Sequence, residues 1–202
     1  MEENFSISEL ICTRISHDLI SNIGAFANAM ELLEDEDDEF AGEIKSTLKI
    51  CSKVLTARMK FFRLAFGLSN SNLENFAFVQ SVTADYLQTL NMNHPITLEC
   101  KISDAGNFNR VVMLGAMAAA DTVVRGGKVE IGSDSKYLKI SAVSPANLAA
   151  GKINAMREVL QGRLPDNLSA LAPFLYMQKL LLAMGRRLEF SETGSEFTIL
   201  IS

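Results

Sequence analysis

His17 and Asp18 are the neighbouring side chains with the clearest chemical potential in this chain. An imidazole nitrogen is nucleophilic near neutral pH, because the unperturbed pKa of histidine is about 6.5, and an adjacent carboxylate can orient the ring or accept its proton. The surrounding apolar residues repeat with a helical period, and a helix turns about 100° per residue. On such a helix His17 lies almost opposite the apolar stripe. The ring is therefore expected to face outward, open to a molecule that docks from outside.

The residues expected to share the exposed side of the helix with His17 are mostly small or polar. Small side chains permit the close approach of another protein's active site. Arg14, one turn before His17, can neutralise anionic oxygens, and Ile20, outside the apolar stripe, can form a small apolar contact patch. The sequence thus predicts a docking face around His17, made of Arg14, Ile20, Ser21, Gly24 and Asn28.

Two arginines further along the chain, Arg58 and Arg63, are additional candidates to contact docking phosphates or acidic partner residues. An ion pair within the fold is the simpler interpretation of each. The second histidine, His94, precedes Pro95 in a predicted turn and has no carboxylate neighbour. It is therefore interpreted as a structural or surface residue.

The composition restricts the class of protein. Hydrophobic residues make up 48% of the 202, which suffices for a packed core, and the net charge of -5 disfavours nucleic acid as a partner. No apolar run is long enough to span a bilayer, and the acidic start does not fit a secretory signal. The three cysteines are odd in number and far apart, which fits neither a metal site nor a disulfide framework. A cytoplasmic protein with reduced thiols and no bound metal is expected.

Two long helices are predicted to position the His17 face. The first begins at a capping box, Ser6 to Glu9, with Phe5 and Leu10 as a hydrophobic staple, and continues to about residue 33. The acidic run over residues 34–39 predicts a turn, and apolar residues every three or four positions predict a second helix over 40–66, stopped at Gly67. A single hairpin of this kind cannot bury both apolar stripes, whereas two copies can. Residues 1–67 are therefore expected to form a homodimeric four-helix bundle.

The rest of the chain has a different character. Residues 68–72 are polar and predict a linker, and residues 73–202 predict a second domain of the α+β class, an α/β sandwich with helices covering one face of a largely antiparallel sheet. Helices are predicted near 73–91, 108–124, 148–161 and 170–184. Strands are predicted near 96–102, 128–132, 137–143, 187–191 and 196–201.

Several segments resemble the bacterial histidine phosphotransferases of the ChpT family. His17-Asp18-Leu19, followed by Asn22-Ile23-Gly24-Ala25, is similar to the phospho-accepting helix of two-component proteins. Phe61–Gly67 resembles the family's signature at the end of the second helix. The similarity extends, more weakly, through Met30-Glu31-Leu32-Leu33, Arg125-Gly126-Gly127, Leu160-Gln161-Gly162, Tyr176-Met177-Gln178 and Gly185.

This resemblance implies a dimeric helical stem that carries a phosphorylated histidine, and a second domain like the ATP-binding domain of histidine kinases in degenerate form. The kinase domain carries an asparagine on one helix and an Asp-x-Gly-x-Gly motif. Here Met113–Asp121 contains no asparagine, and Ser144–Leu148 contains neither the acidic residue nor the glycines. This chain is therefore expected to bind no ATP and no other cofactor, while Mg²⁺ is expected on the partner's receiver domain.

The resemblance also implies a phosphorelay. His17 would take a phosphoryl group from the receiver domain of a hybrid histidine kinase and pass it to response regulators, with Asp18 orienting the imidazole or accepting its proton. Ser21 stands where related bifunctional kinases place an Asn or Thr that aligns a hydrolytic water, so a carrier is expected rather than a strong phosphatase. Two alternatives stay open: a dimeric pseudokinase that docks response regulators without transfer, and a divergent histidine autokinase.

Overall fold

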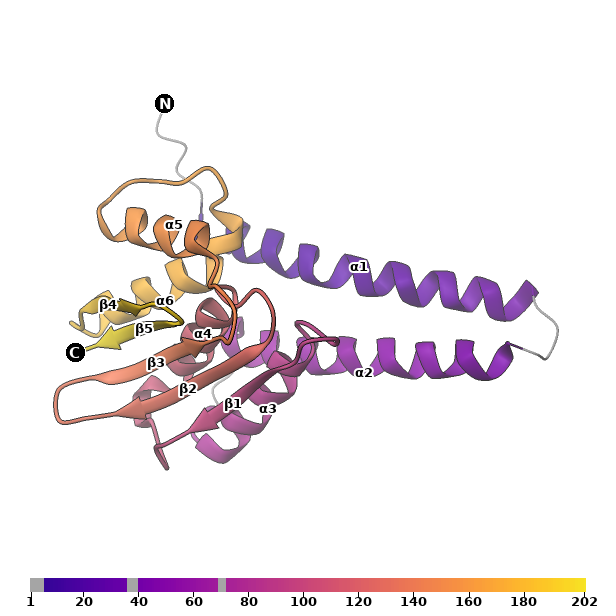
Figure 1. The fold of residues 1–202 in the computed structure, drawn as a ribbon, viewed down its shortest axis with the longest axis horizontal. Helices are drawn as coiled ribbons and strands as arrows, with labels where there is room; N and C mark the ends of the chain where they lie inside the picture. The colour runs from indigo at the N-terminus through magenta and orange to yellow at the C-terminus, as the bar shows by residue number, and fades with distance from the viewer. Residues whose placement is uncertain (1–5, 36–39, 69–71) are drawn as a thin grey trace.

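Two long antiparallel helices form a hairpin that projects from an α/β domain (Figure 1). They are α1 (Ile7–Asp35) and α2 (Ala41–Phe66) in a computed structural model that describes residues 6–35, 40–68 and 72–202. The predicted capping box is confirmed. The Ser6 N–H donates to Glu9 Oε2 at 2.8 Å, and the Glu9 N–H donates to Ser6 Oγ at 3.3 Å. The staple residue Phe5 and residues 36–39 of the acidic run lie outside the described residues.

The second domain is built on a five-stranded sheet with the order β1-β2-β3-β5-β4. Three of the four strand pairs are antiparallel, as predicted. The pair β1–β2 is parallel, a feature the sequence prediction missed, because the chain crosses over a helix between these strands. The strands are β1 (Ile96–Cys100), β2 (Gly127–Ser133), β3 (Leu138–Val143), β4 (Leu188–Thr193) and β5 (Glu196–Ile201).

Four α-helices and two short 3-10 helices, η1 (Gly106–Phe108) and η2 (Ser169–Leu171), complete the described part of the domain. The crossover helix α4 lies between the sheet and α6, and all its residues from Val111 to Ala120 are buried. Pro173 stands in the first turn of α6 and does not kink it, because the first helical N–H groups have no partner to lose. The helices are α3 (Phe76–Gln88), α4 (Asn109–Ala120), α5 (Ala150–Leu160) and α6 (Ala172–Ala183).

The base of the hairpin packs into the second domain through aromatic rings. Phe61, which is fully buried, stacks on Tyr86 of α3 with ring centroids 4.0 Å apart, and Phe62 meets the same ring edge-on at 5.7 Å. Phe66 meets Tyr176 of α6 at 6.1 Å. The predicted stop of α2 at Gly67 is confirmed, and its N–H donates to the Arg63 carbonyl at 3.1 Å. The hairpin is thus anchored in the core of the domain.

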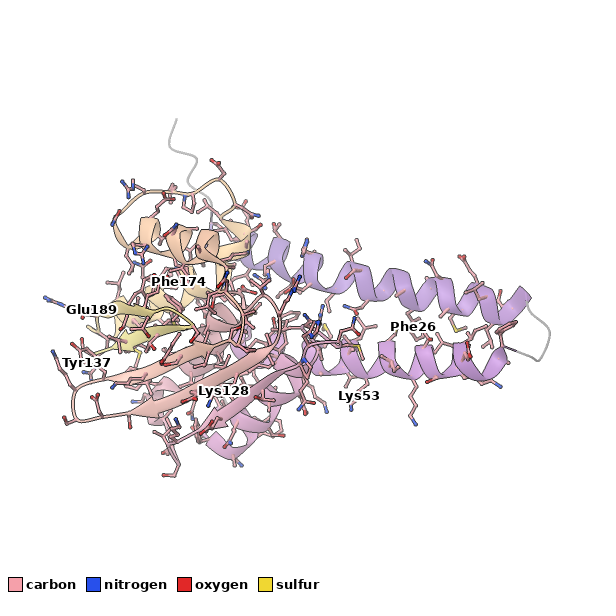
Figure 2. The ribbon with its side chains drawn as sticks, viewed as in Figure 1. Phe26, Lys53, Lys128, Tyr137, Phe174 and Glu189 are labelled. Carbon is pink, nitrogen blue, oxygen red and sulfur yellow. The ribbon has the colours of Figure 1, made fainter. Side chains whose placement is uncertain are left out.

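Further from the domain, α1 and α2 pack side by side (Figure 1). Phe26 lies between α1 and α2, and Lys53 points away from the hairpin (Figure 2). None of the helices in the described part of the chain is both long and apolar enough to cross a membrane. Cys12, Cys51 and Cys100 are free thiols.

Candidate functional site

His17 projects from the half of α1 that lies nearer the second domain. Its side chain is 84% exposed, which confirms the outward position that the helical period predicts. Its Nδ1 lies 3.3 Å from Asp18 Oδ1. Because an ionised carboxylate only accepts hydrogen bonds, this contact is a hydrogen bond in the tautomer that carries the imidazole proton on Nδ1. Nε2 then carries the free lone pair, as a nucleophile requires.

Asp18 is held from its other side by a buried arginine. Arg14 Nε donates to Asp18 Oδ2 at 2.8 Å, and the two side chains are only 10% and 13% exposed. The same guanidinium donates from Nη1 and Nη2 to the two carboxylate oxygens of Asp121, at 2.8 and 2.9 Å, and from Nη1 to the Ala170 carbonyl at 2.9 Å. Arg14 therefore joins α1 to the end of α4 and to the segment before α6.

The prediction that Arg14 belongs to the exposed docking face is wrong. The residue is 8% exposed, because α6 and the turn before it cover this part of α1. Burial lowers the pKa of the guanidinium, but the hydrogen bond to Asp121 and the charges of Asp121 and Asp18 outweigh that effect and raise the pKa above its ordinary value. Arg14 is thus permanently charged, and its donors point to protein groups.

Arg58 also has an internal role in place of the predicted docking role. Its Nε and Nη2 donate to the side chain and carbonyl of Thr89, at 3.1 and 2.9 Å, and its Nη1 donates to the carbonyl of Asp18. The interpretation of Arg58 as a residue that pairs within the fold agrees better with the structure. Its partners are a hydroxyl and two carbonyl groups, whereas the sequence predicted a carboxylate. Arg58 ties α1 and α2 to the end of α3.

The other predicted members of the docking face remain accessible around His17. Ile20 is 69% exposed, and Ser21, Gly24 and Asn28 are exposed on the same helix. Arg63 is exposed on α2. Their role in docking stays a prediction, since the structure establishes only that a partner can reach them.

Sequence reasoning missed Asp121 as a member of the site. It lies 107 positions after Arg14, at the end of a helix whose period identifies only core residues. One signal was available: Arg14 and Asp18 are spaced four apart, which indicates an ion pair on one helix face. A second carboxylate that competes for the same arginine becomes visible only when the helices are packed.

The region where α4 faces α5 and α6 has almost no free space. Its cavity, beside Ala118 and Asp121, has a volume of about 10 Å³ and is bounded by Met156 and Phe174. Sites for small molecules typically have volumes of roughly 300–1,000 Å³. The volume of this cavity is far below that range. In the described residues, no group of three or more His, Cys, Asp or Glu side chains is arranged to hold a metal ion.

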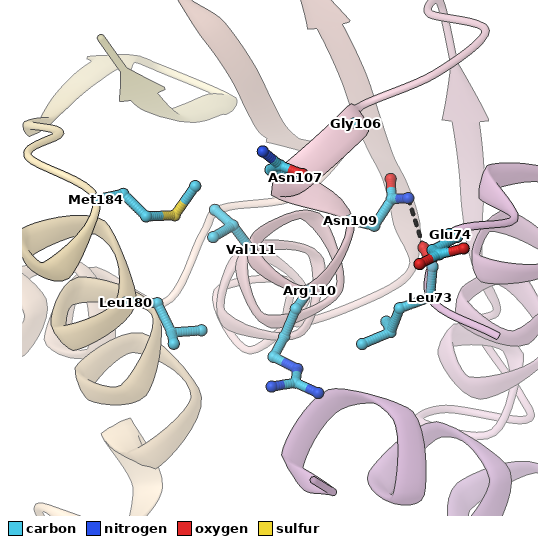
Figure 3. A pocket seen from close by; sticks show the side chains of 9 residues that line it. All are labelled: Leu73, Glu74, Gly106, Asn107, Asn109, Arg110, Val111, Leu180 and Met184. Carbon is cyan, nitrogen blue, oxygen red and sulfur yellow. Dashed lines mark hydrogen bonds between the residues drawn. The ribbon is translucent and has the colours of Figure 1, made fainter. Parts of the chain in front are cut away.

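A larger pocket, of about 270 Å³, lies at the opposite end of α4 (Figure 3). Asn109 Nδ2 donates to the Leu73 carbonyl at 2.6 Å on one side, and Leu180 and Met184 of α6 line the other. A helix of 12 residues is about 18 Å long, so this pocket is well separated from Asp121. It is not part of the His17 site.

Comparison with known proteins places this geometry in a family. A family model described as the histidine phosphotransferase C-terminal domain matches residues 79–196, more than half of the chain. Protein phosphotransferase ChpT of Brucella abortus (strain 2308) is 42% identical over 67 residues, which cover 32% of this chain and 30% of that relative's length.

A solved structure of a bacterial phosphotransferase shares the fold. It superposes with a TM-score of 0.78 at 22% identity, over 100% of this chain and 98% of the solved chain. That agreement extends to both the helical hairpin and the α/β domain, and the predicted family resemblance is confirmed. The chain therefore belongs to the histidine phosphotransferase family.

Proposed function

We propose that this protein is a phosphorelay histidine phosphotransferase that carries a phosphoryl group on His17. The observation that carries the proposal is the exposed imidazole, 84% accessible, with Nδ1 against Asp18 and Nε2 free. The group moves between the receiver-domain aspartates of a hybrid histidine kinase and of response regulators. The receiver supplies Mg²⁺, and this chain supplies the nucleophile.

The phosphoryl group comes from another protein. The asparagine and the Asp-x-Gly-x-Gly motif of the kinase domain are missing from Met113–Asp121 and Ser144–Leu148, which supports a phosphoryl donor other than ATP bound to this chain. The open His17 face, with Ser21 and Gly24 as small neighbours and Ile20 as an apolar contact, fits the approach of a whole protein domain. Phosphoryl transfer depends mainly on positioning and charge neutralisation, which such a complex provides.

A transfer assay tests the proposal. Wild-type protein is mixed with a receiver domain carrying labelled phosphoaspartate, and the label on each chain is followed with time. We expect label to appear on this chain in an acid-labile form and to be absent from His17→Ala. His94→Ala is the matched control, since it removes the other histidine, and it is expected to accept label like the wild type.

The alternative functions give different results in the same experiment. Labelling of His17 from γ-labelled ATP with no receiver present would identify an autokinase and overturn the proposal. A stable complex with the receiver that His17→Ala leaves unchanged, without any acid-labile phosphate on the wild type, would identify a pseudokinase that only binds.

We further propose that two copies associate through the hairpin into a four-helix bundle. Several large apolar side chains of α1 and α2 remain exposed in the single chain, and a groove between the helices is lined by further apolar residues such as Ile15, Leu55 and Phe66. Exposed apolar patches of this kind mark protein contacts. Among the exposed side chains, Ile23 and Met30 belong to the apolar stripe of α1, and Met59 of α2 lines the groove.

Replacing Ile23 with Glu is expected to convert the dimer to a monomer. Ile23 belongs to the apolar stripe of α1 yet is 53% exposed, so a carboxylate there is tolerated in one chain but is buried when two chains pack. Analytical ultracentrifugation measures the mass in solution. Leu164→Glu is the control, because Leu164 is 70% exposed in the loop after α5 and belongs to neither α1 nor α2. A monomeric wild type, or a dimeric Ile23→Glu variant, would contradict the bundle.

A further inference from the structure

His17 is connected to the second domain by an unbroken chain of polar contacts. Asp18 Oδ1 lies against His17 Nδ1, Asp18 Oδ2 accepts from Arg14, and Arg14 donates to both oxygens of Asp121. Three of the four side chains are largely buried: Arg14 is 10%, Asp18 13% and Asp121 17% exposed. The terminal imidazole, at 84%, is the largely exposed member of the four.

We propose that Asp121 is a positioning residue for His17, acting through Arg14 and Asp18 to hold the imidazole with its proton on Nδ1 and Nε2 directed outward. The inference deepens the proposed function and rests on it for its role in phosphoryl transfer. It assigns to the second domain, which carries Asp121, an influence on the nucleophile of the helical hairpin that passes through two intervening side chains.

The guanidinium of Arg14 divides its N–H donors between two carboxylates. An arginine presents a planar fork, and two parallel N–H groups of that fork pair well with one carboxylate. Here the Nη pair is taken by Asp121, so only Nε is left for Asp18 and only Oδ2 of Asp18 is used. Oδ1 is thereby left to accept from His17. Without Asp121 the fork is free to hold both oxygens of Asp18, in competition with the imidazole.

The burial of Arg14, Asp18 and Asp121 holds their side chains in this one orientation. Hydrogen bonds to charged groups are stronger in a poorly hydrated environment than in water, and they fix side-chain orientation. The carbonyl of Ala170, at 2.9 Å from Arg14 Nη1, adds a contact that holds the guanidinium in place. An exposed histidine on a helix would otherwise rotate freely. The three buried side chains thus give direction to a ring that has no packing of its own.

In the proposed transfer step, the imidazole proton stays on Nδ1 throughout. The Nε2 lone pair attacks the phosphorus of the receiver's phosphoaspartate, so an N–P bond forms. The P–O bond to that aspartate breaks, and its electron pair stays on the departing carboxylate. The ring becomes positively charged, and the Asp18 carboxylate faces the N–H that carries part of this charge. Return transfer to another receiver reverses the same bonds.

The tautomer of His17 tests the inference without any partner. Full-length protein is labelled with ¹⁵N in histidine only, and the chain has two histidines, so His94 is an internal reference. At a pH where the rings are neutral, the wild type is expected to show His17 with its proton on Nδ1. In Asp121→Asn, the ¹⁵N signals of the His17 ring are expected to shift toward those of the Nε2–H tautomer, which an unconstrained histidine favours. The ¹⁵N signals of His94 are expected to stay unchanged.

Transfer kinetics separate an effect on the transfer rate from an effect on docking of the receiver. Asp121→Asn is expected to lower the transfer rate at saturating phosphorylated receiver by about tenfold, less than the full effect of a group that itself moves the proton. The receiver concentration for half-maximal rate is expected to stay the same, since Asp121 does not lie on the exposed face. Asp166→Asn, an exposed carboxylate with the same charge change, serves as the control and keeps wild-type values.

Distinct outcomes separate this inference from the proposed function. An unchanged His17 tautomer in Asp121→Asn would overturn the positioning role, whatever the rate. A shifted tautomer in a protein that accepts no phosphoryl group would leave the positioning intact and overturn the function. Arg14→Lys keeps the charge but lacks the fork, and the same tautomer shift is expected there. If Asp121→Asn yields too little folded protein, the tautomer of His17 in Arg14→Lys tests the positioning role instead.

Discussion

Replacing Arg14 with Met is expected to lower the free energy of unfolding by about 3–5 kcal/mol, the usual cost of removing one partner from a buried ion pair. Met retains much of the apolar stem, so the loss comes from the charge. The substitution leaves the carboxylates of Asp18 and Asp121 facing the same emptied space without a cation, each less than one-fifth exposed. Urea denaturation followed by circular dichroism measures the change.

A surface ion pair in the same chain provides the control. Arg157 Nη2 lies 2.8 Å from Glu192, as close as Arg14 lies to its partners, but both side chains are more than 40% exposed. Arg157→Met is therefore expected to cost less than about 1 kcal/mol. Equal losses in the two variants would show that burial does not strengthen the Arg14 contacts.

Replacing Phe61 with Ala is expected to cost about 3–5 kcal/mol, the range for truncating a buried aromatic ring. Phe61 is fully buried, and its ring stacks on Tyr86 at 4.0 Å with an interplanar angle of 14°. It also meets Phe62 edge-on at 6.1 Å. The cavity left behind lies where the hairpin enters the domain. Hydrogen exchange along α3 is expected to rise together with the loss of stability.

Phe78 is the matched control for Phe61. It lies on α3, as Tyr86 does, but is 38% exposed. Phe78→Ala is expected to cost less than Phe61→Ala by at least about 2 kcal/mol, because a partly exposed ring leaves no closed cavity. Similar losses in the two variants would contradict the view that Phe61 anchors the hairpin.

Local signals in the sequence predicted most of the fold. The capping box at Ser6 predicts the start of α1, and the helical spacing of apolar residues predicts both long helices. Alternating apolar residues and turn residues predict all five strands of the sheet to within a few positions. These features depend on residues close in sequence. The parallel pairing of β1 with β2 was missed, because it depends on the crossover through α4 and not on either strand alone.

The site was predicted only in part for a related reason. A helical wheel correctly places the side chains of His17 and Ile20 in solvent, where they are 84% and 69% exposed. It places Arg14 with them, but a wheel contains no information about neighbouring helices. The Ala170 carbonyl and the Asp121 carboxylate approach Arg14 from segments more than 100 residues away. Packing between distant parts of the chain, not the local period, decides which polar residues are exposed.

The anchoring of α1 and α2 in the second domain has a consequence for how a partner is recognised. Arg14, Arg58 and the Phe61–Tyr86 stack fix the hairpin to the domain before any partner arrives. A protein that contacts both the hairpin and the second domain therefore binds a single preformed surface. Its binding does not have to restrict the motion of the hairpin relative to the domain. Preorganisation of this kind reduces the entropy lost on association. A short-lived complex can then be specific while its contact area stays small enough for rapid release.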